Sequence, residues 1–165
     1  MQIRTARLLL RRARPDDVDA IYAIMSDPRA MRYWSSLPHE NRDVTARFIA
    51  DMLVEAPDRD LFMVEQDGQV IGRLGVWKFP EVGFIFHPRT WGQGIGYEAM
   101  SAFTAHCFAR PQVSELTADV DPRNAASIGL LTKLGFVETG RAERTFLIGD
   151  EWCDSIYLTL PRPTA

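Results

Sequence analysis

The stretch "HPRTWGQGIGYEAM" covers residues 87–100 and carries glycine at three alternate positions, Gly92, Gly94 and Gly96. The run before it, "EVGFIFH" at 81–87, is typical of a strand, and residues 94–109 have the apolar spacing of a helix. A helix that begins beside glycines presents unpaired N–H groups and a partial positive charge, which together bind phosphate. The stretch therefore predicts a phosphate-binding loop between a strand and a helix; the alternative is a tight turn with nothing bound.

Two other phosphate-binding motifs do not match this stretch. A P-loop ends in Gly-Lys-Ser or Gly-Lys-Thr, and a dinucleotide-binding loop needs glycine where Tyr97 stands. The dinucleotide motif also follows the first strand of its half-sheet, whereas this loop follows a predicted hairpin and a further strand. Both of these site classes are therefore disfavoured.

The rest of the chain alternates between strand-like and helix-like patterns. Asp67-Gly68, between two β-rich runs, is a strong hairpin signal, and a second turn is expected near Gly149-Asp150. The expected strands are 3–13, two within 59–79, 81–87, 113–120 and two beyond 135; the expected helices are 14–27, 42–56, 94–109 and 124–135, with a short helix and a loop in 28–41.

This order of elements predicts an α/β (α+β) fold. One βαβ-like crossover among meander strands indicates a single mixed, mostly antiparallel sheet of about seven strands flanked by about four helices. A chain of 165 residues fits one domain spanning residues 1–165.

Composition excludes several classes of protein. Hydrophobic residues make up 46% and charged residues 25% of the chain, as in globular proteins, and the net charge of −3 argues against a nucleic-acid partner. No apolar run approaches the roughly 20 residues of a membrane span, and no leader is expected. Cys107 and Cys153 show no paired spacing and the three histidines form no metal motif, so we expect a cytoplasmic protein without a metal site.

Three segments together resemble the GNAT superfamily of acyl-CoA-dependent N-acetyltransferases. Arg89, Gly92 and Gly94 match its loop motif [Arg/Gln]-x-x-Gly-x-[Gly/Ala], and Asn124, Ser127 and residues 133–136 are similar to its second motif, Asn-x-x-Ser with a following Lys-Leu-Gly-Phe. "ARLLLRRARPDD", residues 6–17, resembles its opening strand and helix start. "TWGQGIGYEAM" at 90–100 and the tail "GDEWCDSIYLTL" at 149–160 are similar to the RimJ/RimL-like branch, which resembles ribosomal-protein N-terminal acetyltransferases.

The resemblance implies an enzyme that moves an acetyl group from acetyl-CoA to a primary amine by direct attack in a ternary complex. The acceptor is then a peptide N-terminal α-amine or a small-molecule amine such as a polyamine, amino acid or antibiotic. A non-catalytic acyl-CoA-binding module is the alternative from another class. A homodimer is compatible with this resemblance, and the negative net charge is compatible with a cationic acceptor.

The resemblance also implies where acetyl-CoA binds. Backbone N–H groups of Ile85, Phe86 and His87, on a strand separated from its neighbour, would hold the acetyl carbonyl and the pantetheine arm, and the pyrophosphate would lie over residues 92–97. The expected cofactor-binding residues are Ile85, Phe86, His87, Arg89, Trp91, Gly92, Gln93, Gly94, Ile95, Gly96, Tyr97, Asn124 and Ser127.

Glu81 is the expected general base, because several GNAT enzymes keep a carboxylate at the start of this strand. An ordinary glutamate is too weak a base at neutral pH, so the hypothesis requires burial beside Val82 and Phe84 to raise its pKa. A solvated acid at the start of a strand is the alternative.

Many GNAT members use a tyrosine as general acid, and here that position is Leu131. The acid role then falls to Ser127, or to no side chain at all. Asn124 and Ser127 are three residues apart at a helix start and share one face, where Asn124 is also a good N-cap. Tyr33 and Trp34 lie where the family places acceptor-binding residues; hydrophobic packing is the alternative for both.

Overall fold

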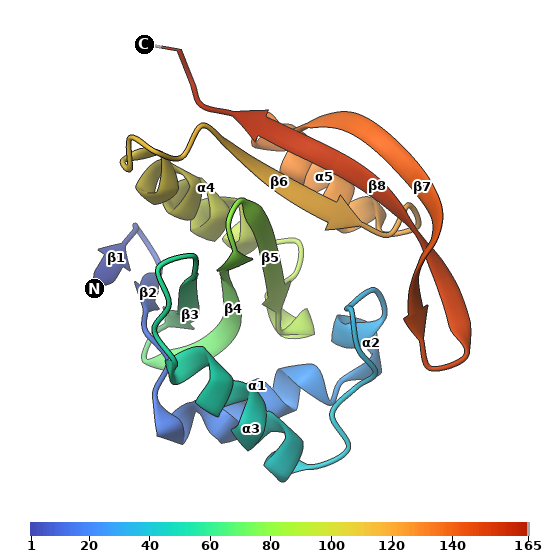
Figure 1. The fold of residues 1–165 in the computed structure, drawn as a ribbon. Helices are drawn as coiled ribbons and strands as arrows, with labels where there is room; N and C mark the ends of the chain where they lie inside the picture. Colours follow the sequence, from blue (N-terminus) through green and yellow to red (C-terminus); the bar gives the residue numbers. More distant parts are fainter. Residues whose placement is uncertain (165) are drawn as a thin grey trace.

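The computed structural model describes residues 1–164, in which eight strands form a single sheet in the order β1-β2-β3-β4-β5-β6-β8-β7 (Figure 1). The strands are β1 (Gln2–Arg4), β2 (Leu9–Arg11), β3 (Asp60–Gln66), β4 (Gln69–Lys78), β5 (Glu81–Phe86), β6 (Glu115–Val120), β7 (Val137–Ile148) and β8 (Glu151–Pro161). The helices are α1 (Val18–Met25), α2 (Pro28–Met31), α3 (Arg42–Leu53), α4 (Ile95–Phe108) and α5 (Ala125–Lys133). The expected mixed, mostly antiparallel sheet is confirmed, since β5 and β6 are its only parallel neighbours in the described residues.

The strands differ from the expectation at one place near the N-terminus, and the short helix expected in 28–41 is present. The single strand expected over 3–13 is a pair, β1 and β2, joined by a turn in which the Thr5 N–H donates to the Leu8 carbonyl at 3.0 Å. The fifth helix is α2, in the segment expected to hold a short helix; Pro28 starts it and Asp27 caps it by accepting from the Arg29 N–H.

Both expected hairpins are confirmed. Asp67 and Gly68 have φ of 50° and 76°, the left-handed conformations that a two-residue turn needs, and they join Gln66 to its partner Gln69. At the second hairpin Ile148 pairs with Glu151 around Gly149, whose φ is 61°. In Figure 1 this long hairpin of β7 and β8 extends past the sheet toward α2.

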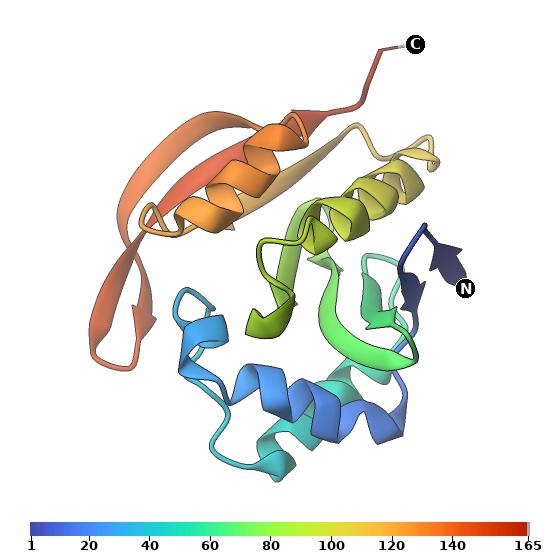
Figure 2. The same ribbon diagram turned by 180° about the vertical axis from the view of Figure 1, so that it is seen from behind.

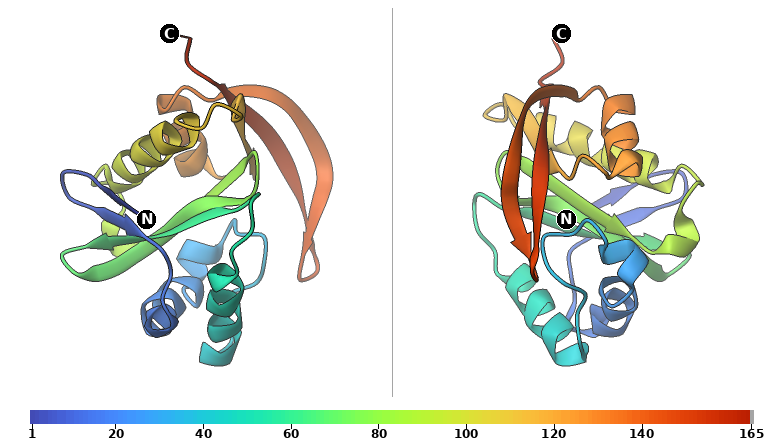
Figure 3. Two further views of the ribbon diagram at one scale, coloured as in Figure 1. Left: turned by 60° about the vertical axis from the view of Figure 1, so that its left-hand side comes forward. Right: turned by 90° about the vertical axis from the view of Figure 1, so that its right-hand side faces the viewer.

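The sheet opens between β5 and β6. Their register contains a single pair, Glu81 with Thr117, where the Thr117 N–H donates to the Pro80 carbonyl at 3.0 Å. Beyond this pair the strands diverge, so that β6, β8 and β7 form a second arm of the sheet (Figure 3). The opening faces the loop that connects β5 to α4.

Two apolar cores cover the two faces of the sheet. One unites α4 and α5 with side chains such as Val82 and Phe86, and the other unites α1, α2 and α3 with side chains such as Met63 and Ile85. Figure 2 shows α4 and α5 lying together, away from α1 and α3. Strand alternation divides β5 between these cores, because consecutive side chains point to opposite faces. No helix within residues 1–164 has the length and apolar character to cross a membrane.

Candidate active site

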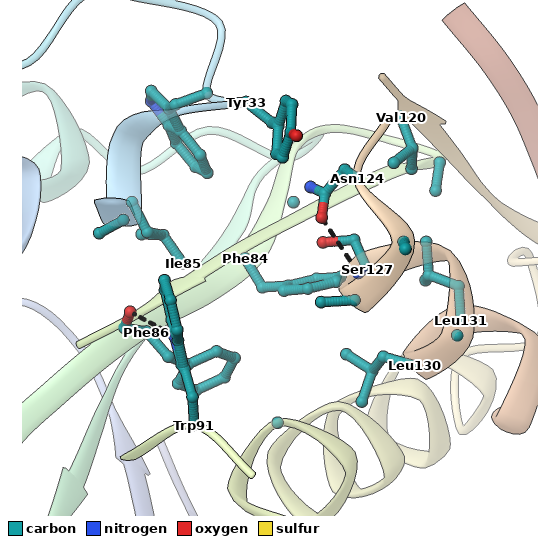
Figure 4. Close-up of a pocket in the computed structure, with 18 of the residues that line it drawn as sticks. Tyr33, Phe84, Ile85, Phe86, Trp91, Val120, Asn124, Ser127, Leu130 and Leu131 are labelled. Atoms are coloured by element: carbon teal, nitrogen blue, oxygen red, sulfur yellow. Dashed lines mark hydrogen bonds between the residues drawn. The ribbon is translucent and has the colours of Figure 1, made fainter. Parts of the chain in front are cut away.

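A cavity of about 880 Å³ occupies the opening between β5 and β6. Side chains of β5 line one side of it, and Asn124, Ser127 and Leu131 line another (Figure 4). The loop of residues 90–97 closes one end, and Arg29, Arg32, Tyr33 and Trp34 from the α2 region close the other. The cavity therefore brings together four segments that are far apart in the sequence.

The free edge of β5 offers backbone groups to this cavity. The His87 N–H donates to the Ile71 carbonyl at 2.8 Å, and an antiparallel ladder uses alternate residues in this way, so His87 and Ile85 direct their backbone groups toward β4. Phe84 and Phe86 direct theirs toward the opening. Of the three expected donors, Ile85 and His87 are corrected, because their N–H groups face β4 and consecutive strand residues cannot both donate to the same edge. The Phe86 N–H faces the opening, and its binding of the acetyl group stays a prediction.

Two of the three glycines are required by the backbone. Gly92 and Gly94 have φ of 72° and 74°, conformations that disfavour any other L-residue. Gly96 lies in the first turn of α4, where a β-carbon would make ordinary van der Waals contact with Leu130 at 3.5 Å. Gly92 and Gly94 therefore shape the loop, whereas the packing around Gly96 has room for a small side chain.

The loop presents a row of donors. None of the hydrogen bonds within residues 1–164 uses an N–H of residues 92–97, and the first helical bond of α4 runs from the Glu98 N–H to the Gly94 carbonyl at 3.0 Å. Such a row at a helix N-terminus fits a pyrophosphate. The residues present therefore fit the phosphate end of CoA, and the open edge of β5 fits its amide-bearing arm.

Arg7 supports the loop from a distant part of the chain. Its guanidinium donates to the Gln93 carbonyl at 2.9 Å and to the Glu98 carboxylate at 2.6 Å. Thr5 donates to the same carboxylate at 2.6 Å. These contacts join the turn between β1 and β2 to the loop and to α4. A contact across more than 80 residues leaves no local pattern in a sequence.

The other expected loop residues divide between the cavity and the outer surface. Trp91 lines the cavity and donates from Nε1 to the Phe86 carbonyl at 3.2 Å, as Figure 4 shows. Tyr97 also lines the cavity, and Lys133 Nζ lies 4.4 Å from the centre of its ring. Arg89 instead donates to Gln69 at 3.0 Å, beside a separate hollow of about 530 Å³. Gln93 donates to the Arg89 carbonyl at 2.7 Å, so its side chain holds the loop itself.

Asn124 and Ser127 lie together at the start of α5. The side-chain Oδ1 of Asn124 accepts from the Ser127 N–H at 3.2 Å, the capping geometry expected of that residue (Figure 4). Ser127 lines the cavity, and Leu131 is fully buried one turn later. An apolar residue thus occupies the place where the resemblance leads one to expect tyrosine.

Glu81 lies at the closed end of the opening and does not line the cavity. Burial raises its pKa, and the negative charge of Asp119 adds to this rise. The residue as a whole is exposed, so water limits the effect. Val82 and Phe84, the expected source of burial, point to the opposite face of β5, toward the core of α4 and α5.

Asp119 is the residue that the sequence reasoning missed. It lies on β6 two positions beyond Thr117, on the same face as Glu81, and it lines the cavity. Burial raises its pKa, opposed by a hydrogen bond with Ser155. Alternation in "ELTADV" indicates a polar face at this strand, but no local signal shows that the face borders a cavity.

The α2 end of the cavity is aromatic and charged. Tyr33 lines it with the guanidinium of Arg32 at 5.0 Å and that of Arg123 at 5.7 Å from its ring. Trp34 also lines it and packs on the core of α1, α2 and α3, where the buried Arg73 guanidinium lies 5.4 Å from its ring. The packing expected as an alternative for Trp34 is therefore present together with exposure to the cavity.

Comparison with known proteins assigns a family to this geometry. A family model described as an acetyltransferase (GNAT) domain matches residues 7–137. The chain is 25% identical over 165 residues to the uncharacterised N-acetyltransferase YnaD of Bacillus subtilis (strain 168), across 97% of this chain and 96% of that one.

Solved structures share the same fold. The Salmonella typhimurium acetyltransferase that modifies the N-terminal serine of ribosomal protein L7/L12 has a TM-score of 0.87 at 16% identity, covering 98% of this chain and 99% of that one. Spermidine N-acetyltransferase from Vibrio cholerae, in complex with CoA and spermine, has a TM-score of 0.82 at 20% identity, covering 96% and 97%. At these identities the likeness concerns the fold.

Proposed function

The chain belongs to the GNAT family of acetyltransferases, and we propose that its cavity transfers the acetyl group of acetyl-CoA to the α-amine at a peptide N-terminus. The chain is therefore an enzyme, an N-acetyltransferase acting on amines. The observation that carries the finer proposal is the single cavity that joins an N–H-rich loop to an acceptor end across the open edge of β5. The proposed acceptor rests on the RimJ/RimL-like tail and loop and on the shared fold of an enzyme that modifies an N-terminal serine.

Binding of acetyl-CoA is proposed to use backbone groups. The N–H groups of residues 92–97 would hold the pyrophosphate, and those of Phe84 and Phe86 would hold the acetyl carbonyl and the pantetheine arm. Asn124 and Ser127 would bind this arm from α5. The thioester of acetyl-CoA supplies an activated acetyl group and a thiolate leaving group.

Two side chains are proposed to move protons. The amine nitrogen forms its bond to the acetyl carbon while the bond from that carbon to sulfur breaks. Glu81 would first take a proton from the acceptor ammonium, through a water molecule because it lies outside the cavity lining. Ser127 would give a proton to the departing thiolate, since Leu131 has none to give. The second proton that the nitrogen loses on becoming an amide would restore the Ser127 hydroxyl.

The α-amine is favoured over a lysine side chain by its acidity. Its pKa is near 8, against about 10.4 for a lysine ε-amine, so a modest base releases more of its neutral form at pH 7. Small-molecule amines such as polyamines are the second candidate, because a spermidine N-acetyltransferase shares the fold. A cytoplasmic location and a homodimer stay predictions.

A thiol-release assay with acetyl-CoA tests the acceptor. The panel holds peptides with free N-termini, the same peptides with a blocked N-terminus and one free lysine, and a free polyamine. We expect the free N-terminus to have the highest kcat/KM. A polyamine that turns over faster than every peptide would contradict the proposed acceptor class, and absence of thiol release with any amine would contradict acetyl transfer itself.

A further inference from the structure

The acceptor is proposed to enter at the α2 end of the cavity, called the acceptor end below. Most charged side chains there are already paired with one of opposite sign. Arg29 binds Asp27 at 2.7 Å. Arg123 binds Asp121 at 2.8 Å and Glu151 at 2.7 Å, which ties the start of α5 to the hairpin of β7 and β8. The two charges of each pair neutralise each other, so these side chains add little binding energy for an acceptor.

Two charges of opposite sign are left over. Within residues 1–164, neither Asp119 nor Arg32 takes part in an ion pair, although both line the cavity. Asp119 is half-buried on β6, and Arg32 is exposed beside the Tyr33 ring. Arg32 is close enough to Asp121 to help lower the pKa of that carboxyl, but Arg123 already binds both oxygens of Asp121 and is the larger cause.

We propose that the preferred acceptor is a primary amine with an anionic group beside it, whose ammonium binds Asp119 and whose anion binds Arg32. The inference rests on the proposed function, since it names the acceptor class of the same cavity. The negative net charge was compatible with a cationic acceptor. That charge of −3 is a sum over the whole chain, whereas the acceptor end carries the unpaired cation of Arg32, so the inference replaces the cationic acceptor with one that also bears an anion.

The spacing of the two charges suits a compact acceptor. Asp121 lies two residues beyond Asp119, which corresponds to roughly 6–7 Å along an extended chain. Arg123 binds Asp121 and shares the Tyr33 ring with Arg32, whose guanidinium lies 5.0 Å from the ring centre. An amine and an anion a few bonds apart, each held by a charge-assisted hydrogen bond of about 2.8 Å, span a similar length. A polyamine would instead place a second cation near Arg32.

Two sources supply this chemistry: a free α-amino acid, through its own carboxylate, and a peptide N-terminus with an acidic residue in second place. Matched acceptors separate them. One pair is alanine and alaninamide; the other is Ser-Asp-Ala-amide and Ser-Asn-Ala-amide. Each pair keeps the size of the acceptor and changes its charge. The carboxylate of alanine also makes its ammonium less acidic than that of alaninamide, so kcat/KM in this pair is compared for the neutral amine fraction.

The experiment measures kcat/KM for both pairs with the wild-type enzyme and with Arg32→Ala, Arg32→Lys and Arg47→Ala. Arg47 is an exposed arginine on α3 outside the cavity lining, so its variant controls for lost net charge. We expect the wild-type enzyme to prefer the anionic member of at least one pair by about tenfold, as a hydrogen bond between charged groups supplies. Arg32→Ala should bring that ratio close to one, Arg32→Lys should retain part of it, and Arg47→Ala should leave it unchanged.

Preference in the alanine pair identifies a free amino acid, and preference in the peptide pair identifies an acidic N-terminus. Equal rates within both pairs, or a preference that survives Arg32→Ala, would overturn the inference. The CoA-induced rise in Tm checks that each variant is folded. Turnover of amines without any charge preference refutes this inference alone, whereas no turnover of any amine refutes the proposed function.

Discussion

Glu81 and Asp119 are two carboxylates on one face of the sheet, on neighbouring strands at the point where these strands separate. Burial is the main reason that the pKa of each is raised, and the charge of Asp119 also acts on Glu81. A raised pKa makes a carboxylate a better base, which is the property that acetyl transfer needs. The two residues differ in access, because only Asp119 lines the cavity.

Substitution of Glu81→Gln tests the base. We expect kcat/KM to fall by about 10² at neutral pH, the usual range for loss of a general base, with CoA affinity little changed. The loss should shrink as pH rises and the amine deprotonates without help. Because the pKa of Glu81 is raised, wild-type activity should decline on the acidic side at a higher pH than an ordinary glutamate would give.

The measurement is a profile of kcat/KM against pH for the wild-type enzyme, Glu81→Gln and Asp119→Asn. Wild-type rates in Glu81→Gln across the whole range would leave Glu81 as a solvated acid. Asp119→Asn is expected to raise KM if Asp119 binds the acceptor ammonium. A fall in kcat confined to Asp119→Asn would transfer the role of base to the residue that lines the cavity.

Asp119 should also affect stability. Its folded-state pKa is raised, so its protonated form is tolerated and its charged form is penalised as pH rises above the unfolded value of about 3.9. We expect Asp119→Asn to raise Tm at pH 7, with the gain shrinking as pH falls toward 4. Thermal melts at the two pH values check this, and a lower Tm at pH 7 would show that the charged form is stabilised in the folded protein.

At the scale of elements, α5 combines a structural and a binding task in its first turn. Asn124 caps the helix through the Ser127 N–H, and both side chains lie at the cavity. A cap needs only an oxygen at the right place, whereas a ligand contact also depends on the length and amide group of the side chain. The two tasks can therefore be separated by substitution.

Replacement of Asn124 by alanine and by serine makes this separation. Asn124→Ala should lower the free energy of unfolding by about 1 kcal/mol, while Asn124→Ser should retain most of it, because serine is a comparable cap. If Asn124 also binds the pantetheine arm, both variants should bind CoA more weakly than the wild-type protein. Denaturant unfolding and CoA titration measure the two effects; unchanged CoA affinity in both would restrict Asn124 to capping.

At the scale of the whole molecule, the sheet consists of two arms, β1 to β5 and β6 to β8. These arms share a single residue pair beside the opening. A ligand that contacts β5, the loop of residues 92–97 and α5 at once should stabilise the folded state, since it binds only when these parts are assembled. The arms are otherwise held by the pair of Glu81 with Thr117 and by packing of α4 and α5.

CoA should therefore raise Tm. At 100 times the dissociation constant, the expected stabilisation is about 2.7 kcal/mol. Gly94→Val should melt lower even without ligand, since Gly94 has φ of 74°, and it should also lose the CoA-induced shift. An equal shift in both proteins, measured by thermal melts with and without CoA, would exclude this loop as the phosphate site.

Local patterns in the sequence were enough to predict the strands, the main helices and both hairpins, because each depends on residues within a few positions of one another. Asp67-Gly68 predicted its turn since few dipeptides adopt two left-handed conformations so readily. The glycine loop and Asn124 were likewise placed correctly, because caps and turns are local. The division of the first strand into β1 and β2 was missed; its turn is closed by hydrogen bonds between Thr5 and Leu8, and Glu98 of α4 binds Thr5 and Arg7 within it.

Only the tertiary structure decided which groups face the cavity. The register of β4 with β5 selects Phe84 and Phe86 over their neighbours, and the separation of β6 from β5 exposes Asp119. The tertiary structure also decided which charged side chains lack an ion pair. Arg123 forms one with Glu151 of the β7–β8 hairpin, whereas Arg32 forms none within residues 1–164. Pairings between distant segments depend on how strands and helices pack, and hydrophobic periodicity carries no information about partners so far apart in the chain.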